Sequence, residues 1–315
     1  MQHILYLVPT RLGDTLMLTP ALALLKQLKS PCEIDILAFG ALGSEVYKNN
    51  PHVNTTHLWS DISKNMDSFL QPYDVVVAAH RHPKTYEALL TLKKPIIWIE
   101  PADQGQAQAQ QALNFIRRVF KGDGAPQPAM GYELYPSAED FEQARIMLPS
   151  DQQYIGLHLG CHGLAKPSIF PWRTRLQHKK VWPIANFLKL ARHLQSSHPS
   201  YRIVLTGSQY EQQLARAFTK DFPQAIDLVG KTDVLLLAAI MRIFKAYICS
   251  DTGPMHIACS MNTPLLALFG PTNAVRTGPY PVNRLRKEII TNNLFLLESE
   301  VVMSALDDLL SNIDE

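Results

Sequence analysis

A chain of 315 residues is longer than the size at which one hydrophobic core usually stops growing, so its length predicts two domains of roughly 150 residues each. Hydrophobic residues make up 46% of the chain and charged residues 18%, which is typical of a globular protein and excludes an intrinsically disordered one. The formal net charge of +2 argues against a general nucleic-acid-binding protein and allows only a local basic patch for an anionic ligand.

The N-terminal segment, MQHILYLVPTRLGD, contains too short an apolar run for a signal peptide and predicts a strand. No run of about 18 apolar residues follows it, so we expect no membrane-spanning helix, and contact with a membrane surface remains open. The cysteines show no Cys-x-x-Cys spacing and lie in or beside apolar runs, as reduced buried thiols do, which indicates a cytosolic compartment. They are Cys32, Cys161, Cys249 and Cys259.

Short apolar runs, many of them β-branched, predict strands along the whole chain, with amphipathic helices such as ALALLKQLK and IANFLKLARHLQ between them. This alternation predicts an α/β fold with parallel, doubly wound sheets. The runs are ILYLV from residue 4, IDILAF from 34, VVVAA from 75, IIWI from 96, YIGLHL from 154, RIVLTG from 202, AYICS from 246 and LLALFG from 265.

The rhythm breaks between about residues 101 and 150, where the chain is polar and rich in glycine and proline. We place a helix and then the interdomain linker there, which gives domains 1–150 and 151–315, the second ending in a helix over about 296–312. Because open parallel sheets bind ligands beyond the carboxyl ends of their strands, the loops after the strands are the candidate sites.

The loop after the first strand, PTRLGDTLMLT, carries Arg11, Gly13 and Asp14. One interpretation of Asp14 is purely structural, because a carboxylate at the start of a helix complements the helix dipole. That interpretation leaves Arg11 unexplained. A dinucleotide fingerprint is excluded, because this loop lacks the three glycines of GxGxxG and the second strand does not end in an acidic residue.

The loop after the strand at 75, HRHPK, gathers basic or potentially basic side chains at a strand end. A solvated run of charge is the usual explanation of such a cluster. Its location favours a function instead, since an anionic ligand at this edge would meet His80, Arg81 and Lys84 together with Arg11.

Two features of the second half suit a phosphate and a ribose. Lys180 precedes a helix start marked by Pro183, where it can reach a phosphate near the helix terminus. Glu211 begins the next helix after TGSQY, where it complements the dipole and can also hydrogen-bond a ribose diol.

The segment SDTGPMHIA delivers Asp251, Thr252 and Gly253 from a strand into a helix that begins at Pro254, where free amides and the dipole favour a diphosphate. Asp251 can accept hydrogen bonds from sugar hydroxyls, and His256 either orients the loop or is a buried histidine with a structural role. After the next strand, FGPT makes a second turn at the same edge, so the pair of turns predicts a bound sugar nucleotide.

The segments ILYLVPTRLGDTLMLTPALALLKQLK, KKVWP, TGSQYEQQLA and SDTGPMHIACSMNTPLLALFGPTNAVRTGP resemble, in this order, the signatures of glycosyltransferase family 9, the ADP-heptose:lipopolysaccharide heptosyltransferases. The resemblance implies a GT-B fold of two Rossmann-like domains facing a cleft, with inverting transfer that needs neither a metal nor another cofactor. It implies Asp14 as the catalytic carboxylate, diphosphate contacts at Lys180, Thr252 and Gly253, a ribose contact at Glu211, a sugar contact at Asp251 and the acceptor on the N-terminal domain.

The expected activity is therefore transfer of heptose from ADP-heptose to the inner core of lipopolysaccharide, by a cytoplasmic protein in peripheral contact with the inner face of the inner membrane. The expected partners are a nucleotide-sugar donor and an anionic lipopolysaccharide precursor, and no nucleic acid. Three alternatives stay open: a family member that uses another nucleotide sugar, a nucleotide-sugar epimerase of the same fold, and a non-catalytic sugar-nucleotide-binding protein.

Overall fold

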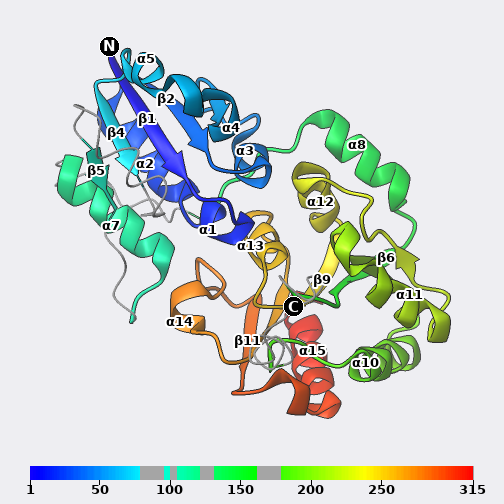
Figure 1. Cartoon of the computed structure of the whole chain (residues 1–315). Helices are drawn as coiled ribbons and strands as arrows, with labels where there is room; N and C mark the ends of the chain where they lie inside the picture. The colour runs from blue at the N-terminus through cyan, green and yellow to red at the C-terminus, as the bar shows by residue number, and fades with distance from the viewer. Residues whose placement is uncertain (79–95, 100–104, 121–130, 162–178, 315) are drawn as a thin grey trace. The chain divides into compact units, whose positions relative to one another are not determined.

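The computed structural model describes residues 1–78, 96–99, 105–120, 131–161 and 179–314. These residues form two compact units, Met1–Tyr135 and Pro136–Glu315, each built on its own parallel sheet (Figure 1). The α/β class with two doubly wound sheets is therefore confirmed.

The first unit contains a five-stranded sheet in the order β3-β2-β1-β4-β5, and all of its strand pairs are parallel. The central strand β1 is buried from Ile4 to Val8, because neighbouring strands and helices cover it on both faces. The strands are β1 (Gln2–Val8), β2 (Cys32–Ala38), β3 (Thr56–Leu58), β4 (Val75–Ala78) and β5 (Ile96–Trp98).

Helices α2, α3 and α4 contact this sheet, α1 packs on α3, and α7 packs along α2. One apolar cluster, in which Leu5 and Leu7 of β1 take part, carries the packing of α4 and α5. The helices are α1 (Leu12–Leu16), α2 (Thr19–Lys29), α3 (Ala41–Tyr47), α4 (Trp59–Ile62), the 3-10 turn η1 (Ser63–Asn65), α5 (Met66–Leu70) and α7 (Gln108–Phe120).

The second unit contains a six-stranded parallel sheet in the order β11-β10-β9-β6-β7-β8. The chain builds outward in one direction from β6 and in the other from β9, so these two neighbouring strands flank the point where the strand order reverses. The strands are β6 (Gln153–His158), β7 (Tyr201–Thr206), β8 (Ile226–Asp227), β9 (Phe244–Ser250), β10 (Leu265–Phe269) and β11 (Arg286–Ile290).

One apolar cluster joins this sheet to α10, α11 and α15, and every residue of α12 is buried where that helix packs against β9, α13 and α8. The terminal helix α15 thus packs on the second unit, through Val302, Leu306 and Leu309 among others. The helices are α8 (Ala138–Met147), α10 (Ile184–Ser197), η2 (Gln209–Glu211), α11 (Gln212–Asp221), α12 (Val234–Met241), α13 (Gly253–Ser260), α14 (Ala274–Thr277), η3 (Leu294–Leu296) and α15 (Ser299–Asp314).

The sequence and the structure differ in two places. The apolar runs found every central strand but missed β3, β8 and β11, which are short or carry charged residues at or near a sheet edge. The unit boundary lies between Tyr135 and Pro136 rather than at 150/151, because α8 packs on α12 of the second unit. None of the helices in the described ranges is long and apolar enough to cross a membrane.

Candidate functional site

The carboxyl edge of the second sheet gathers most of the predicted donor-site residues. β6 and β9 pair with each other, and the loops that follow them begin at Leu159 and Asp251. The chain leaves these two strands in opposite directions, and this strand-order reversal is the position where open α/β sheets bind ligands.

Lys180 reaches this edge through backbone packing. A Cβ on Gly270, the residue after β10, would lie under 3.0 Å from the carbonyl oxygen of Lys179, so only glycine fits there. Just beyond, the indole of Trp182 is fully buried and donates a hydrogen bond of 2.9 Å from Nε1 to the carbonyl oxygen of Leu297. The half-buried Lys180 thus lies between Lys179, whose carbonyl packs against Gly270, and Trp182, whose indole is bonded to Leu297.

Glu211 lies at the ends of β6 and β7 and its carboxylate is held on both oxygens. Oε2 accepts hydrogen bonds from the backbone N–H of Ser208 at 2.7 Å and from its hydroxyl at 3.0 Å, which completes a capping box on η2. Oε1 lies 3.1 Å from Nε2 of His158, the last residue of β6. Burial alone would raise the pKa of Glu211, but His158 and the Ser208 hydrogen bonds outweigh it and lower that pKa to about 2, so the carboxylate is ionised at neutral pH.

The charges of three predicted residues act on the thiol of Cys161. This side chain, in the loop after β6, is 4% exposed, and burial raises its pKa to about 11. Lys180 opposes that rise in the pKa, whereas the negative charges of Glu211 and Asp251 add to it. The charges of all three residues therefore act on one thiol that lies in the loop after β6.

The predicted diphosphate turn has the expected local structure. Thr252 is the N-cap of α13, Gly253 is its first residue, and proline occupies the first turn. Within the described ranges no side chain caps this helix, and the hydroxyl of Thr252 donates to the carbonyl oxygen of Ser250 at 3.2 Å. The backbone amides at the start of the helix are therefore the groups that suit an anion.

His256 is 3% exposed in α13, and burial lowers its pKa to about 4. It is therefore neutral at physiological pH and supplies no positive charge to a diphosphate. The structure places it in the helix that follows the predicted turn.

In the first unit, the loop after β1 places Arg11 and Asp14 beside the corresponding strand-order reversal, between β1 and β4. Arg11 is exposed and is the N-cap of α1, whose first turn contains the partly exposed Asp14. Among the described residues no side chain caps this helix, and the hydroxyl of Thr15 bonds instead to the carbonyl oxygens of Pro9 and Arg11. Asp14 is thus not the N-cap, although its charge still complements the dipole.

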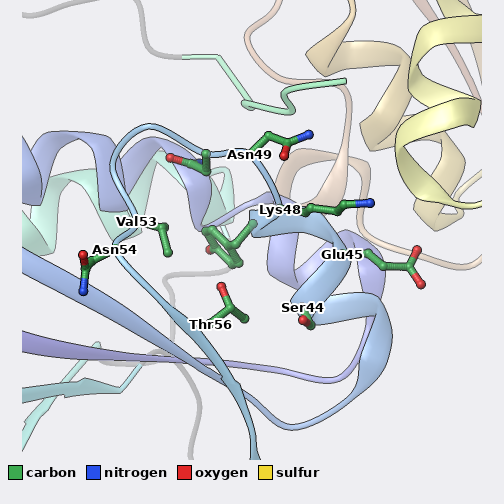
Figure 2. Close-up of a pocket in the computed structure, with 9 residues that line it drawn as sticks. Ser44, Glu45, Lys48, Asn49, Val53, Asn54 and Thr56 are labelled. Atoms are coloured by element: carbon green, nitrogen blue, oxygen red, sulfur yellow. The ribbon is translucent and has the colours of Figure 1, made fainter. Parts of the chain in front are cut away.

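The predicted basic cluster follows β4, which ends at Ala78. His80, Arg81 and Lys84 lie outside the described residues. No predicted site residue lines the pocket drawn in Figure 2, which has a volume of about 450 Å³ and lies between α3 and the amino end of β3. Its polar lining includes Ser44, Asn50 and Thr56.

Three residues of the site were not predicted: His158, Gly160 and Gly207. The signal for His158 was a single polar residue near the carboxyl end of the apolar run YIGLHL. The two glycines follow strands and press against the Glu211 carboxylate, so that a Cβ on Gly160 would lie under 3.0 Å from Oε1 and one on Gly207 at 3.0 Å from Oε2.

Known proteins resemble this chain over both units. The model of glycosyltransferase family 9 (heptosyltransferase) matches residues 73–294. A curated relative, lipooligosaccharide heptosyltransferase 2 of Haemophilus influenzae, is 31% identical over 105 residues, which are 32% of this chain and only 30% of the relative's own length.

Two solved structures share the whole fold. The glycosyl transferase family 9 protein of Veillonella parvula has a TM-score of 0.80 at 19% identity, covering 99% of this chain and 97% of that one. The E. coli ADP-heptose lps heptosyltransferase II has a TM-score of 0.80 at 19% identity and full coverage of both chains. The GT-B fold expected from the sequence is thereby confirmed.

Proposed function

This chain belongs to glycosyltransferase family 9, the heptosyltransferases, and from that premise we propose that it transfers heptose from ADP-heptose to the inner core of lipopolysaccharide. We propose further that the transfer inverts the anomeric centre and needs no metal ion or other cofactor. The observation that supports the proposal is that the charges of Lys180, Glu211 and Asp251 all act on the Cys161 thiol, in the loop after β6 at the strand-order reversal.

In this proposal the second unit binds the donor. The ammonium of Lys180 and the backbone amides of Thr252 and Gly253 hold the diphosphate, since each places a positive charge or a donor where anionic oxygens need one. Glu211 accepts a hydrogen bond from the ribose, and Asp251 accepts one from the sugar. His256 supports the helix that carries the diphosphate turn.

The first unit supplies the base and binds the acceptor. The carboxylate of Asp14 takes the proton of the acceptor hydroxyl while its oxygen forms a bond to the anomeric carbon, and the carbon–oxygen bond to the diphosphate breaks so that ADP leaves with the electron pair. Asp14 is partly exposed in the first turn of α1, and among the described residues its side chain does not cap that helix. Arg11, His80, Arg81 and Lys84 attract the anionic groups of the acceptor at the inner face of the inner membrane.

The substitution Asp14→Asn tests the base. A base role predicts a fall in turnover of roughly 10² to 10⁴ with ADP binding retained, because the amide cannot accept the proton. A dipole role predicts almost no change in turnover, because the effect of one charge at a helix start is about 0.3–1 kcal/mol and acts on stability. Turnover within about threefold of the parent would remove Asp14 from the catalytic machinery.

Incubation of the pure protein with ADP-heptose, with and without heptose-deficient lipopolysaccharide, tests the reaction itself. We expect ADP release and acceptor extension only when both substrates are present. Consumption of the donor without an acceptor would indicate an epimerase, extension with a different nucleotide sugar would replace heptose, and binding without turnover would indicate a non-catalytic protein.

A further inference from the structure

The imidazole of His158 has no role in the donor contacts described so far. It ends β6 at the strand-order reversal and is only 3% exposed. Its Nε2 lies 3.1 Å from Oε1 of Glu211, whereas its Nδ1 has no hydrogen-bond partner in the described part of the chain. Because an ionised carboxylate only accepts, Nε2 carries the proton of this hydrogen bond.

The hydrogen bonds of Glu211 leave little acceptor capacity. A carboxylate offers about four lone-pair sites. Oε2 already accepts from the N–H and from the hydroxyl of Ser208, and Oε1 accepts from His158. Counting donors from the described residues, one site remains, on Oε1, so in this arrangement the carboxylate suits one ligand hydroxyl rather than two.

Several contacts fix the position of the Glu211 carboxylate, including Oε1. Gly160 lies so close to Oε1, and Gly207 so close to Oε2, that the carboxylate occupies the space their side chains would fill. The capping box fixes Oε2, and His158 is the only described side chain that donates a hydrogen bond to Oε1. Without this donor, the capping box would still hold Oε2, but no described side chain would donate to Oε1, so the carboxylate would be oriented less strictly.

We propose that His158 is a positioning residue, whose Nε2–H holds Oε1 of Glu211 so that its remaining lone pair accepts one ribose hydroxyl of a bound nucleoside diphosphate. The proposal rests on the proposed function in that the ligand is a nucleotide. It adds to the proposed donor site a residue that the sequence analysis placed in an apolar strand. It also limits Glu211 to one hydroxyl contact with the ribose.

Calorimetric titration with ADP and with 2′,3′-dideoxy-ADP tests the proposal on four proteins: the parent, His158→Asn, His158→Gln and Ser208→Ala. Gln places its amide nitrogen near the position of Nε2, whereas Asn places its own near that of Nδ1. We expect His158→Asn to weaken ADP binding about tenfold and to leave the dideoxy compound within about twofold, because the lost contact is to a hydroxyl. We expect His158→Gln to retain ADP binding within about threefold of the parent.

Ser208→Ala is the matched control, since it removes a hydrogen bond from the other oxygen of the same carboxylate. Its preference for ADP over the dideoxy compound should equal that of the parent. Equal losses of both ligands in His158→Asn would show a merely structural role and overturn the proposal, as would His158→Gln behaving like His158→Asn. If His158→Asn fails to fold by thermal unfolding, His158→Met, which has a similar volume and no donor, takes its place.

The same titrations with UDP and GDP separate this proposal from the proposed function. A protein that binds UDP or GDP but not ADP refutes the ADP-sugar donor, and the His158 variants are then compared on that nucleotide and its dideoxy form with the same expected losses. A protein that binds none of the three overturns the positioning role.

Discussion

Gly270→Ala should move Lys180 without touching its side chain. The added Cβ would lie under 3.0 Å from the carbonyl oxygen of Lys179, 3.3 Å from its carbonyl carbon and 3.5 Å from Cγ of Leu294. The obstacle is backbone rather than the end of a flexible side chain, so the Lys179 peptide must move. Overpacking of this kind costs about 1–3 kcal/mol of unfolding free energy, and the displaced Lys180 should lose part of a contact worth about 1.5–3 kcal/mol.

The assay is ADP binding by calorimetry, together with chemical denaturation, on a double-mutant cycle. We expect Gly270→Ala to weaken ADP binding about fivefold, and to have no further effect in the Lys180→Ala background, because the contact it disturbs is already gone. Gly40→Ala is the control, since a Cβ there meets Thr10 at an ordinary 3.5 Å. ADP affinity within twofold of the parent, or an equal loss in both backgrounds, would refute the reasoning that Gly270 positions Lys180.

Three further outcomes follow from the same site. Lys180→Ala should weaken ADP binding about tenfold or more by calorimetry, and unchanged affinity would remove Lys180 from the site. Neutralising Arg11, Arg81 and Lys84 should raise the acceptor KM but not the ADP Kd. The effect on KM should shrink at 1 M salt, where the Debye length is about 3 Å. Equal losses of affinity for donor and acceptor would indicate misfolding. Burial lowers the pKa of His256 from 6.5 to about 4, so the folded protein resists protonation of this residue. Its contribution to the free energy of unfolding is fully present above pH 6.5, and about 3 kcal/mol of it is lost as the pH falls to 4. His256→Phe should remove this part of the pH dependence of unfolding, and a pH profile identical to that of the parent would contradict the prediction.

The sequence predicted the central strands because a parallel strand covered on both faces is a continuous apolar run. The edge strands β3, β8 and β11 lack that signature, although the edge strand β5 has it. β8 is only Ile226–Asp227, and β11 begins with three charged residues, Arg286 to Glu288. Their existence follows from pairing with β7 and β10, which is a tertiary contact that no local pattern contains.

The sequence placed the candidate residues in the loops that follow the strands, and this placement follows from the topology of a parallel sheet. The charges of Lys180, Glu211 and Asp251 all act on Cys161, because β6, β7 and β9 are neighbours whose carboxyl ends share one edge. The partner of Glu211 could not be found in the same way. His158 is 53 positions away in the chain, and inside an apolar run it looked like one more buried strand residue.

The glycines at the strand ends explain why the sequence predicted the positions of the turns but not the groups that pack against them. A glycine after a strand predicts that something approaches the backbone closely, and both a ligand and another part of the protein meet that condition. At Gly160 and Gly207 the approaching group is the carboxylate of Glu211, and at Gly270 it is the backbone of Lys179. The requirement for glycine in FGPT therefore comes from the backbone of Lys179. In the proposed function, this turn would act on the donor only through the position of Lys180. We therefore expect the need for glycine at position 270 to be independent of which nucleotide sugar is bound, whereas Gly270→Ala should disturb the turn with any donor.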